Sequence, residues 1–169
     1  MPNKDMQYTK LGNTDIEVSK ICIGAMSFGK PGTMHDWSLD YEDSEKVIKH
    51  ALSLGINFFD TANTYSKGTS EEYLGRALKS DNVPRDQVVL ASKVYFNPGR
   101  LSKEAINREI EGSLKRLGTD YLDLYIIHRF DYDTPIEETM SALNELVKSG
   151  KVRAIGASAM YGYQFHNMQ

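Results

Sequence analysis

The strict alternation of short apolar runs with longer amphipathic segments constrains the fold of this chain more than any other feature of its sequence. The runs have the length and composition of buried strands, and they lie at 21–24, 56–60, 88–93, 122–128 and 152–158. The segments between them repeat their apolar residues at the spacing of a helix that buries one face. This rhythm predicts right-handed βαβ units and therefore a parallel sheet of about five strands.

The expected helices carry recognisable start and stop signals. They span 43–54, 69–78, 102–117 and 134–147. Ser102 is placed to cap the third helix and Gly118 to end it. Thr69 and Thr134 each begin a capping-box pattern, and the proline after Thr134 stands at the expected first helical position. Ahead of the first strand, residues 7–18 alternate around turn-forming residues and predict a β-hairpin.

Two architectures share this alternation, a doubly wound sheet and a β/α barrel. In both of them, ligands bind at the carboxyl ends of the strands. The residues at those ends are Gly24, Asp60, Lys93, His128 and Ser158. Each of them alone has a structural interpretation, such as a helix cap or a rim lysine. Their coincidence at one rim instead predicts a reactive site.

Composition narrows the class of protein. The 169 residues are 40% hydrophobic, which is enough for one soluble domain spanning 1–169 with a real core. A net charge of −3 and the lack of a basic stretch argue against nonspecific nucleic-acid binding. No apolar run is long enough to cross a membrane. Cys22 is the single cysteine, and we expect it to be a core residue rather than a nucleophile. A chain with one cysteine also fits a cytoplasmic protein. The four histidines are scattered, so we expect no metal site.

Tyr65 follows Asp60 on the loop after the second strand, and an acid and a phenol presented together suggest proton chemistry. A free phenol ionises at about pH 10, too high for an efficient acid at neutral pH, and a nearby ammonium favours its ionised form. We expect Lys93 to supply that ammonium and Asp60 to be its counter-ion. We expect His128 to hydrogen-bond a substrate oxygen and orient it. Together these groups form a proton donor aimed at a carbonyl oxygen, which completes a reduction when a hydride reaches the carbon.

Six short motifs match, in order and along nearly the whole chain, those of one enzyme family. They are GAMSFG at 24–29, FDTANTY at 59–65, SEEYLGRAL at 70–78, SKV at 92–94, IHR at 127–129 and IGAS at 155–158. The chain therefore resembles the aldo-keto reductase superfamily. The resemblance implies an α/β fold of the (β/α)₈ TIM-barrel type, here its first five βα units over 21–169 after the hairpin. It also implies a reductase of aldehydes and ketones that uses NADPH, with NADH as the other option.

The resemblance assigns roles to individual residues. It implies Tyr65 as the proton donor, Lys93 and Asp60 as the pair that tunes it, and His128 as the residue that orients the substrate. The cofactor-binding residues that it implies are Gly24, Ala25, Met26, Asp60 and Ser158. Many family members have asparagine after the Ser158 position, where this chain has Ala159, so the resemblance leaves one nicotinamide contact unassigned.

The length departs from the family pattern. A barrel of this type needs roughly 250 residues, so we expect the front half of a reductase with little activity by itself. The loops that grip the cofactor's phosphates would follow Gln169, and the uncovered barrel edges predict self-association. Phe28, Trp37 and Tyr95 on rim loops are the candidates for lining an apolar pocket around a small carbonyl substrate.

Two other classes of function stay open at this point. One is a nucleotide-binding regulatory subunit, because the superfamily includes potassium-channel β subunits. The other is a fragment that folds in part and catalyses nothing. Turnover of a model aldehyde by the complete protein distinguishes an enzyme from both.

Overall fold

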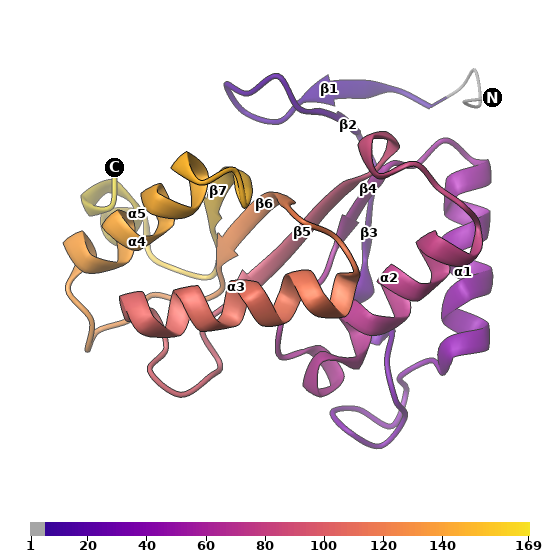
Figure 1. Cartoon of the computed structure of the whole chain (residues 1–169), viewed down its shortest axis with the longest axis horizontal. Coiled ribbons are helices and arrows are strands. Elements are labelled where there is room, and N and C mark those ends of the chain that lie inside the picture. Colours follow the sequence, from indigo (N-terminus) through magenta and orange to yellow (C-terminus); the bar gives the residue numbers. More distant parts are fainter. Residues whose placement is uncertain (1–5) are drawn as a thin grey trace.

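A computed structural model describes residues 6–169 and shows one five-stranded parallel sheet with helices packed along it (Figure 1). The strands are β3 (Cys22–Gly24), β4 (Phe58–Asp60), β5 (Val89–Val94), β6 (Leu122–Ile127) and β7 (Val152–Ala157). Their order in the sheet is their order in the chain. A doubly wound sheet reverses its strand order at a switch point, whereas a β/α barrel adds each strand beside the last. The sheet is therefore of the barrel type.

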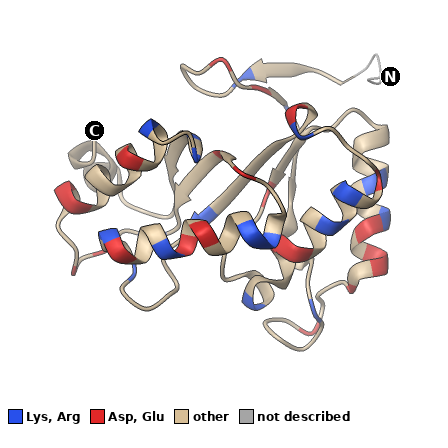
Figure 2. Cartoon of the chain, in the orientation of Figure 1, with Lys and Arg blue, Asp and Glu red and all other residues tan. Residues whose placement is uncertain are grey.

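Each crossover between neighbouring strands carries a helix, as the alternation predicted. The crossover helices are α1 (Tyr41–Ser53), α2 (Thr69–Ser80), α3 (Lys103–Leu117) and α4 (Ile136–Lys148), and α5 (Gly162–Asn167) follows β7. Short 3₁₀ turns are η1 (Ala25–Ser27), η2 (Tyr65–Gly68) and η3 (Arg85–Gln87). Helices α1 to α4 pack side by side, each against the next. Acidic and basic residues alternate along α3 (Figure 2), which fits the small net charge of the chain.

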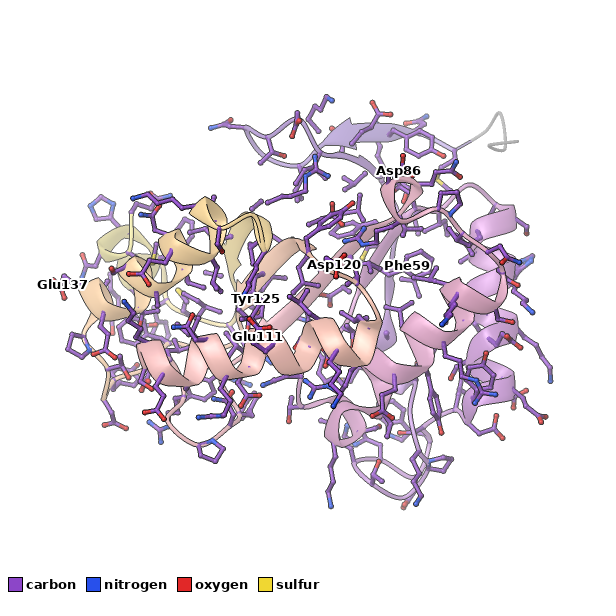
Figure 3. All side chains as sticks on the ribbon, viewed as in Figure 1. Phe59, Asp86, Glu111, Asp120, Tyr125 and Glu137 are labelled. Carbon is purple, nitrogen blue, oxygen red and sulfur yellow. The ribbon has the colours of Figure 1, made fainter. Side chains whose placement is uncertain are left out.

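The main hydrophobic core lies between the sheet and these helices. Phe59 from β4 and Tyr125 from β6 are fully buried there (Figure 3). The stripe that the sequence predicted for α3 is buried as expected; it consists of Ile106, Ile110, Leu114 and Leu117. Burial of such a stripe contributes about 2 kcal/mol for each large aliphatic side chain. This core fixes the strand positions and, with them, the residues at the strand ends.

The predicted hairpin is confirmed as strands β1 (Tyr8–Lys10) and β2 (Glu17–Ser19), which pair antiparallel. It lies at the amino-terminal end of the sheet, because Asn57, just ahead of β4, exchanges hydrogen bonds with Ser19 and donates to the carbonyl of Glu17. Ile16 and Val18 form a small second core with Val89. The hairpin thus covers the end of the sheet opposite the carboxyl ends of the strands.

Three local predictions are wrong. Both predicted capping boxes are absent. Helix α2 starts after Gly68 in a left-handed conformation (φ +92°), with no side-chain cap. At α4, Pro135 is the N-cap, and the hydroxyl of Thr134 donates to Asp131 instead of capping the helix. Cys22 is exposed rather than in the core, because consecutive side chains of a strand point to opposite faces and in β3 it is Ile23 that packs against the main core. The cap at Ser102 is confirmed, since its side chain accepts from the Ala105 N–H.

None of the helices within residues 6–169 is long and apolar enough to cross a membrane.

Candidate active site

Strands β4 and β5 bring Asp60 and Lys93 together at their carboxyl ends. The two strands are neighbours in the sheet, and Asp60 is the last residue of β4. The Lys93 ammonium donates to the Asp60 carboxylate at 2.6 Å and to the carbonyl of Thr61 at 2.9 Å. Lys93 is only 6% exposed, so its charge needs both partners. The structure thus places the predicted ion pair where the strand ends meet.

Tyr65 completes this group from the turn that follows β4. Its hydroxyl oxygen accepts a hydrogen bond from Lys93 Nζ at 3.1 Å, and the residue is 8% exposed. The loop between Asp60 and Tyr65 is fixed against β5, because the N–H of Thr61 donates to Ala91 and that of Asn63 donates to Lys93. The position of the phenol is therefore set by backbone hydrogen bonds to the strand that carries its partner.

The turn η2 bends the chain sharply after Tyr65. Ser66 and Lys67 both have left-handed backbone angles, with φ +47° and +56°, and Gly68 follows at +92°. Residues with side chains rarely adopt this conformation, which costs on the order of 1–3 kcal/mol each and persists only where the surrounding structure holds it. Gly29 packs against this turn so closely that a Cβ there would lie 2.4 Å from the Cβ of Ser66. Strain at this turn is a further sign of a functional site.

His128 follows β6 and faces the phenol. Its ring lies edge-on to that of Tyr65 with 5.7 Å between centroids, and edge-on to Phe96 at 5.0 Å. Burial, and then the nearby charges of Lys93 and Arg129, lower the pKa of His128 to about 4. The imidazole is therefore neutral at pH 7. Its Nδ1 is buried and has no hydrogen-bond partner among residues 6–169, which is unusual for a buried polar atom.

The residues expected to face a cofactor lie at the same end of the sheet but differ in exposure. Gly24 pairs in register with Asp60, and a Cβ added to it would meet nothing within 4 Å. Ala25 is fully buried and Met26 is 41% exposed. Ser158 follows β7, and its N–H donates to the carbonyl of Ile127 at the end of β6, at 2.8 Å. Gly24, at the end of the edge strand β3, and Ser158, after the other edge strand β7, thus lie on either side of the Asp60–Lys93 pair along the carboxyl ends of the strands.

The three aromatic residues predicted to line a substrate pocket are not together. Phe28 is 2% exposed and packs in the main core, while Trp37 is 55% exposed and stacks on His35. Tyr95 lines a cavity of about 480 Å³ beside the strand ends. The other lining residues are Arg129, Phe130, Tyr132, Ala159, Met160, Tyr161 and Gln164. No sequence pattern indicated that these residues line a cavity, although all of them follow the ends of β6 and β7.

No group of residues that could hold a metal ion occurs within the described part of the chain.

The fold and the site together define a class of protein: a barrel-type α/β chain that presents an acid, a lysine, a tyrosine and a histidine at its strand ends. Comparison with known proteins identifies the family. The model of the aldo/keto reductase family matches residues 20–168. The chain therefore belongs to the aldo-keto reductase family, as its motifs indicated.

Individual relatives agree with this assignment. The chain is 42% identical to an aldo-keto reductase of Fusarium vanettenii, over 97% of this chain and 52% of that protein. It is 41% identical to the versiconal hemiacetal acetate reductase of Aspergillus parasiticus, over 97% of this chain and 54% of that protein. Among solved structures, the thermostable aldo-keto reductase Tm1743, in complex with the inhibitor epalrestat, matches with a TM-score of 0.86 and 35% identity, over 96% of this chain and 57% of that one. The chain spans about half the length of the curated relatives that it matches.

Proposed function

We propose that the complete protein is an NADPH-dependent oxidoreductase that reduces small aldehydes or ketones to alcohols. The observation that supports this most is the ammonium of Lys93, which contacts the Tyr65 hydroxyl at 3.1 Å and the Asp60 carboxylate at 2.6 Å. Such a group is suited to delivering a proton to a carbonyl oxygen. We also propose a cytoplasmic location, which is supported by the low cysteine content of this chain.

In this proposal, the bound nicotinamide cofactor supplies a hydride to the carbonyl carbon. Tyr65 donates its hydroxyl proton to the carbonyl oxygen as negative charge develops there. The positive charge of Lys93 stabilises the phenolate that remains, since opposite charges within hydrogen-bond distance attract strongly at a buried site. Asp60, at 2.6 Å, holds the ammonium in place. The same steps in reverse remove a proton from an alcohol.

His128 orients the substrate in the same proposal. Because its pKa is lowered to about 4, the ring is neutral at pH 7 and carries one N–H. A neutral imidazole can donate that hydrogen to a carbonyl oxygen without adding a positive charge beside Lys93. Phe96, which packs edge-on against the ring, restricts its rotation. A substrate oxygen held by His128 would lie close to the phenol, since the two rings are in contact.

The strand ends fit the nicotinamide end of a cofactor. The open space beside Gly24 leaves room for a flat ring near Asp60, because no side chain fills it. Ser158, on the far side of the group, brings a hydroxyl that can hydrogen-bond a carboxamide. Met26, partly exposed, adds an apolar surface near Gly24. Gly24, Met26 and Ser158 are the residues that we expect to hold the nicotinamide.

The test is consumption of NADPH by the complete protein with an aromatic and an aliphatic aldehyde. Turnover that depends on Tyr65 supports the proposal. NADPH binding without turnover of any carbonyl compound would favour the alternative of a nucleotide-binding regulatory subunit. Turnover that survives Tyr65→Phe at full rate would contradict the assignment of the proton donor.

A further inference from the structure

An ion pair between the fully buried Glu71 and the partly buried Arg116 lies on the other side of the sheet from the proposed active site, and the chemistry above does not use it. Glu71, in the first turn of α2, is 0% exposed. One of its carboxylate oxygens accepts from Arg116 Nε of α3 at 2.6 Å. The other accepts from the hydroxyl of Ser92 in β5 at 2.5 Å. Both oxygens of a buried carboxylate are thus bound, one by a helix and one by a strand.

The contact to Ser92 places this carboxylate directly behind the active-site lysine. Ser92 precedes Lys93 on β5, and consecutive side chains of a strand point to opposite faces. Ser92 therefore points toward the helices while Lys93 points toward Tyr65. Anchoring the Ser92 hydroxyl restricts rotation of the strand about its axis. That restriction fixes the direction in which the Lys93 side chain leaves the strand.

The same carboxylate is also close in sequence to the active-site tyrosine. Helix α2 starts directly after the η2 turn that carries Tyr65, and Glu71 lies in its first turn. The hydrogen bond from Ser92 to Glu71 therefore joins the strand that carries Lys93 to the segment that carries Tyr65. It is a short link between Lys93 and Tyr65, whose Nζ and hydroxyl oxygen lie 3.1 Å apart.

Arg116 supports the turn from a second direction. A Cβ added to Gly68, the last residue of η2, would lie 2.8 Å from Arg116 Cδ, so the arginine side chain packs directly on the turn. Helices α2 and α3 are themselves in close contact, because a Cβ added to Gly75 would lie 2.3 Å from the carbonyl oxygen of Leu117. The ion pair is therefore held in a rigid contact between two helices, with the Tyr65 turn resting on it.

We propose that Glu71 is a positioning residue: through Ser92 and Arg116 it sets the distance and direction between Lys93 and Tyr65. A buried ion pair by itself is weak evidence for stability, because removing two charges from water costs much of what their attraction returns. A role in positioning explains the place of this ion pair better. Glu71 binds Ser92, the neighbour of Lys93, and Arg116 packs on the turn that carries Tyr65. This inference rests on the proposed function, in which the Lys93–Tyr65 pair moves the proton.

The experiment measures the Tyr65–Lys93 contact without requiring turnover. The ¹³Cζ resonance of tyrosine reports the hydrogen bond at the phenol oxygen, and the Tyr65 signal is assigned as the one that disappears in Tyr65→Phe. Lys93→Met gives the position of the signal without the ammonium. Ser92→Ala removes one hydroxyl and should move the Tyr65 signal toward the Lys93→Met position. Glu71→Gln, which keeps the shape but removes the charge facing Arg116, should move it in the same direction.

A matched control comes from the amino-terminal end of β5, the strand that carries Ser92 and Lys93. Arg85 binds the buried carboxylate of Asp123 at 2.7 Å, and Asp123 in turn accepts from the Leu90 N–H of β5. Arg85→Met therefore weakens a buried ion pair attached to β5 without touching the Glu71 link. Urea unfolding of every variant measures the loss of stability. The control should lose stability and leave the Tyr65 signal unmoved.

The outcomes separate the two proposals. If Lys93→Met moves the signal and Ser92→Ala does not, the positioning role of Glu71 is wrong, while the proposed function stands. If Arg85→Met moves the signal as much as Ser92→Ala, the effect is general loosening and the positioning role is again wrong. If the Tyr65 signal moves in Ser92→Ala as expected but turnover is insensitive to Tyr65→Phe, the positioning role is upheld and the proposed function fails. Should Glu71→Gln not fold, Ser92→Ala alone decides.

Discussion

Lys93 Nζ lies 3.1 Å from the hydroxyl oxygen of Tyr65, although 28 positions separate the two residues in the chain. An ammonium has three hydrogens to donate, and in Lys93 all three have acceptors: Tyr65, the Asp60 carboxylate and the Thr61 carbonyl. The group therefore has no free hydrogen with which to turn toward another acceptor. This saturation holds a buried charge at a fixed place beside the phenol.

Replacing Tyr65 by phenylalanine tests the proton donor. The ring stays, but the hydroxyl is lost, so carbonyl reduction by the complete protein should fall by about 10²-fold or more, the usual scale of general acid–base catalysis. NADPH affinity should barely change, because the phenol makes no contribution to binding the cofactor in this proposal. Tyr163→Phe is the control: that residue is 64% exposed on α5, and its replacement should leave the rate unchanged. Steady-state kinetics and a cofactor titration measure both quantities.

The Asp60–Lys93 pair should behave as one unit. Lys93→Met leaves the Asp60 carboxylate without its 2.6 Å partner, and Asp60→Asn removes the counter-ion of a lysine that is 6% exposed. Each change should reduce turnover, and the double variant should lose less than the sum of the two losses, because residues in direct contact are not additive. The check is a double-mutant cycle on kcat/KM. Strictly additive losses, or a pH–rate profile of Lys93→Met identical to that of the parent, would argue against the coupling.

Gly75→Ala tests the close contact between α2 and α3. The added Cβ would lie 2.3 Å from the backbone oxygen of Leu117, which cannot move without shifting a helix. Overpacking of this kind costs about 1–3 kcal/mol, so the free energy of unfolding should fall by an amount in that range. Gly162→Ala on α5 is the control, because a Cβ there meets nothing within 4 Å and should leave stability unchanged or slightly raised. Urea denaturation of both variants gives the comparison, and a Gly75→Ala chain as stable as the parent would contradict the packing.

The strand-end residues could be predicted from the sequence because their positions depend on a simple rule. In a parallel sheet the carboxyl ends of all strands meet at one edge, so Asp60, Lys93 and His128 had to lie near one another once the alternation was recognised. The same rule placed Gly24 and Ser158 at that edge. The distances and hydrogen bonds between these residues could be obtained only from the structure.

What the sequence did not predict depends on contacts between segments distant in the chain. Glu71 lies inside the predicted capping box, which pairs Thr69 with Glu72, and local spacing gave no sign that its carboxylate binds Ser92 and Arg116. The cap is absent because Gly68 is the N-cap, and the Thr69 hydroxyl donates to the carbonyl of Ser66 and accepts from the N–H of Lys30. Phe28, an aromatic residue on a loop, was expected at the rim, but it packs in the main core, where it is 2% exposed. In each case, the partner that decides the outcome lies outside the local pattern.

His128 makes the stability of the folded protein depend on pH. Its pKa is lowered from 6.5 to about 4 in the folded protein, mainly by burial. Above pH 6.5 the ring is neutral in both states and contributes nothing. As the pH falls from there toward 4, the unfolded chain binds a proton that the folded chain does not, so the free energy of unfolding decreases through this window and changes no further below it.

His128→Gln removes this linkage and should therefore lose less stability than the parent when the pH is lowered from about 7 to about 5. The carboxylates titrate alike in both proteins, so the difference between the two losses isolates the histidine. His50→Gln, an exposed residue near the end of α1, is the matched control and should keep the pH dependence of the parent. Urea unfolding at the two pH values measures the effect. Equal losses in the parent and in His128→Gln would show that the folded state does not disfavour the charged ring, and would remove the neutral imidazole from the proposed mechanism.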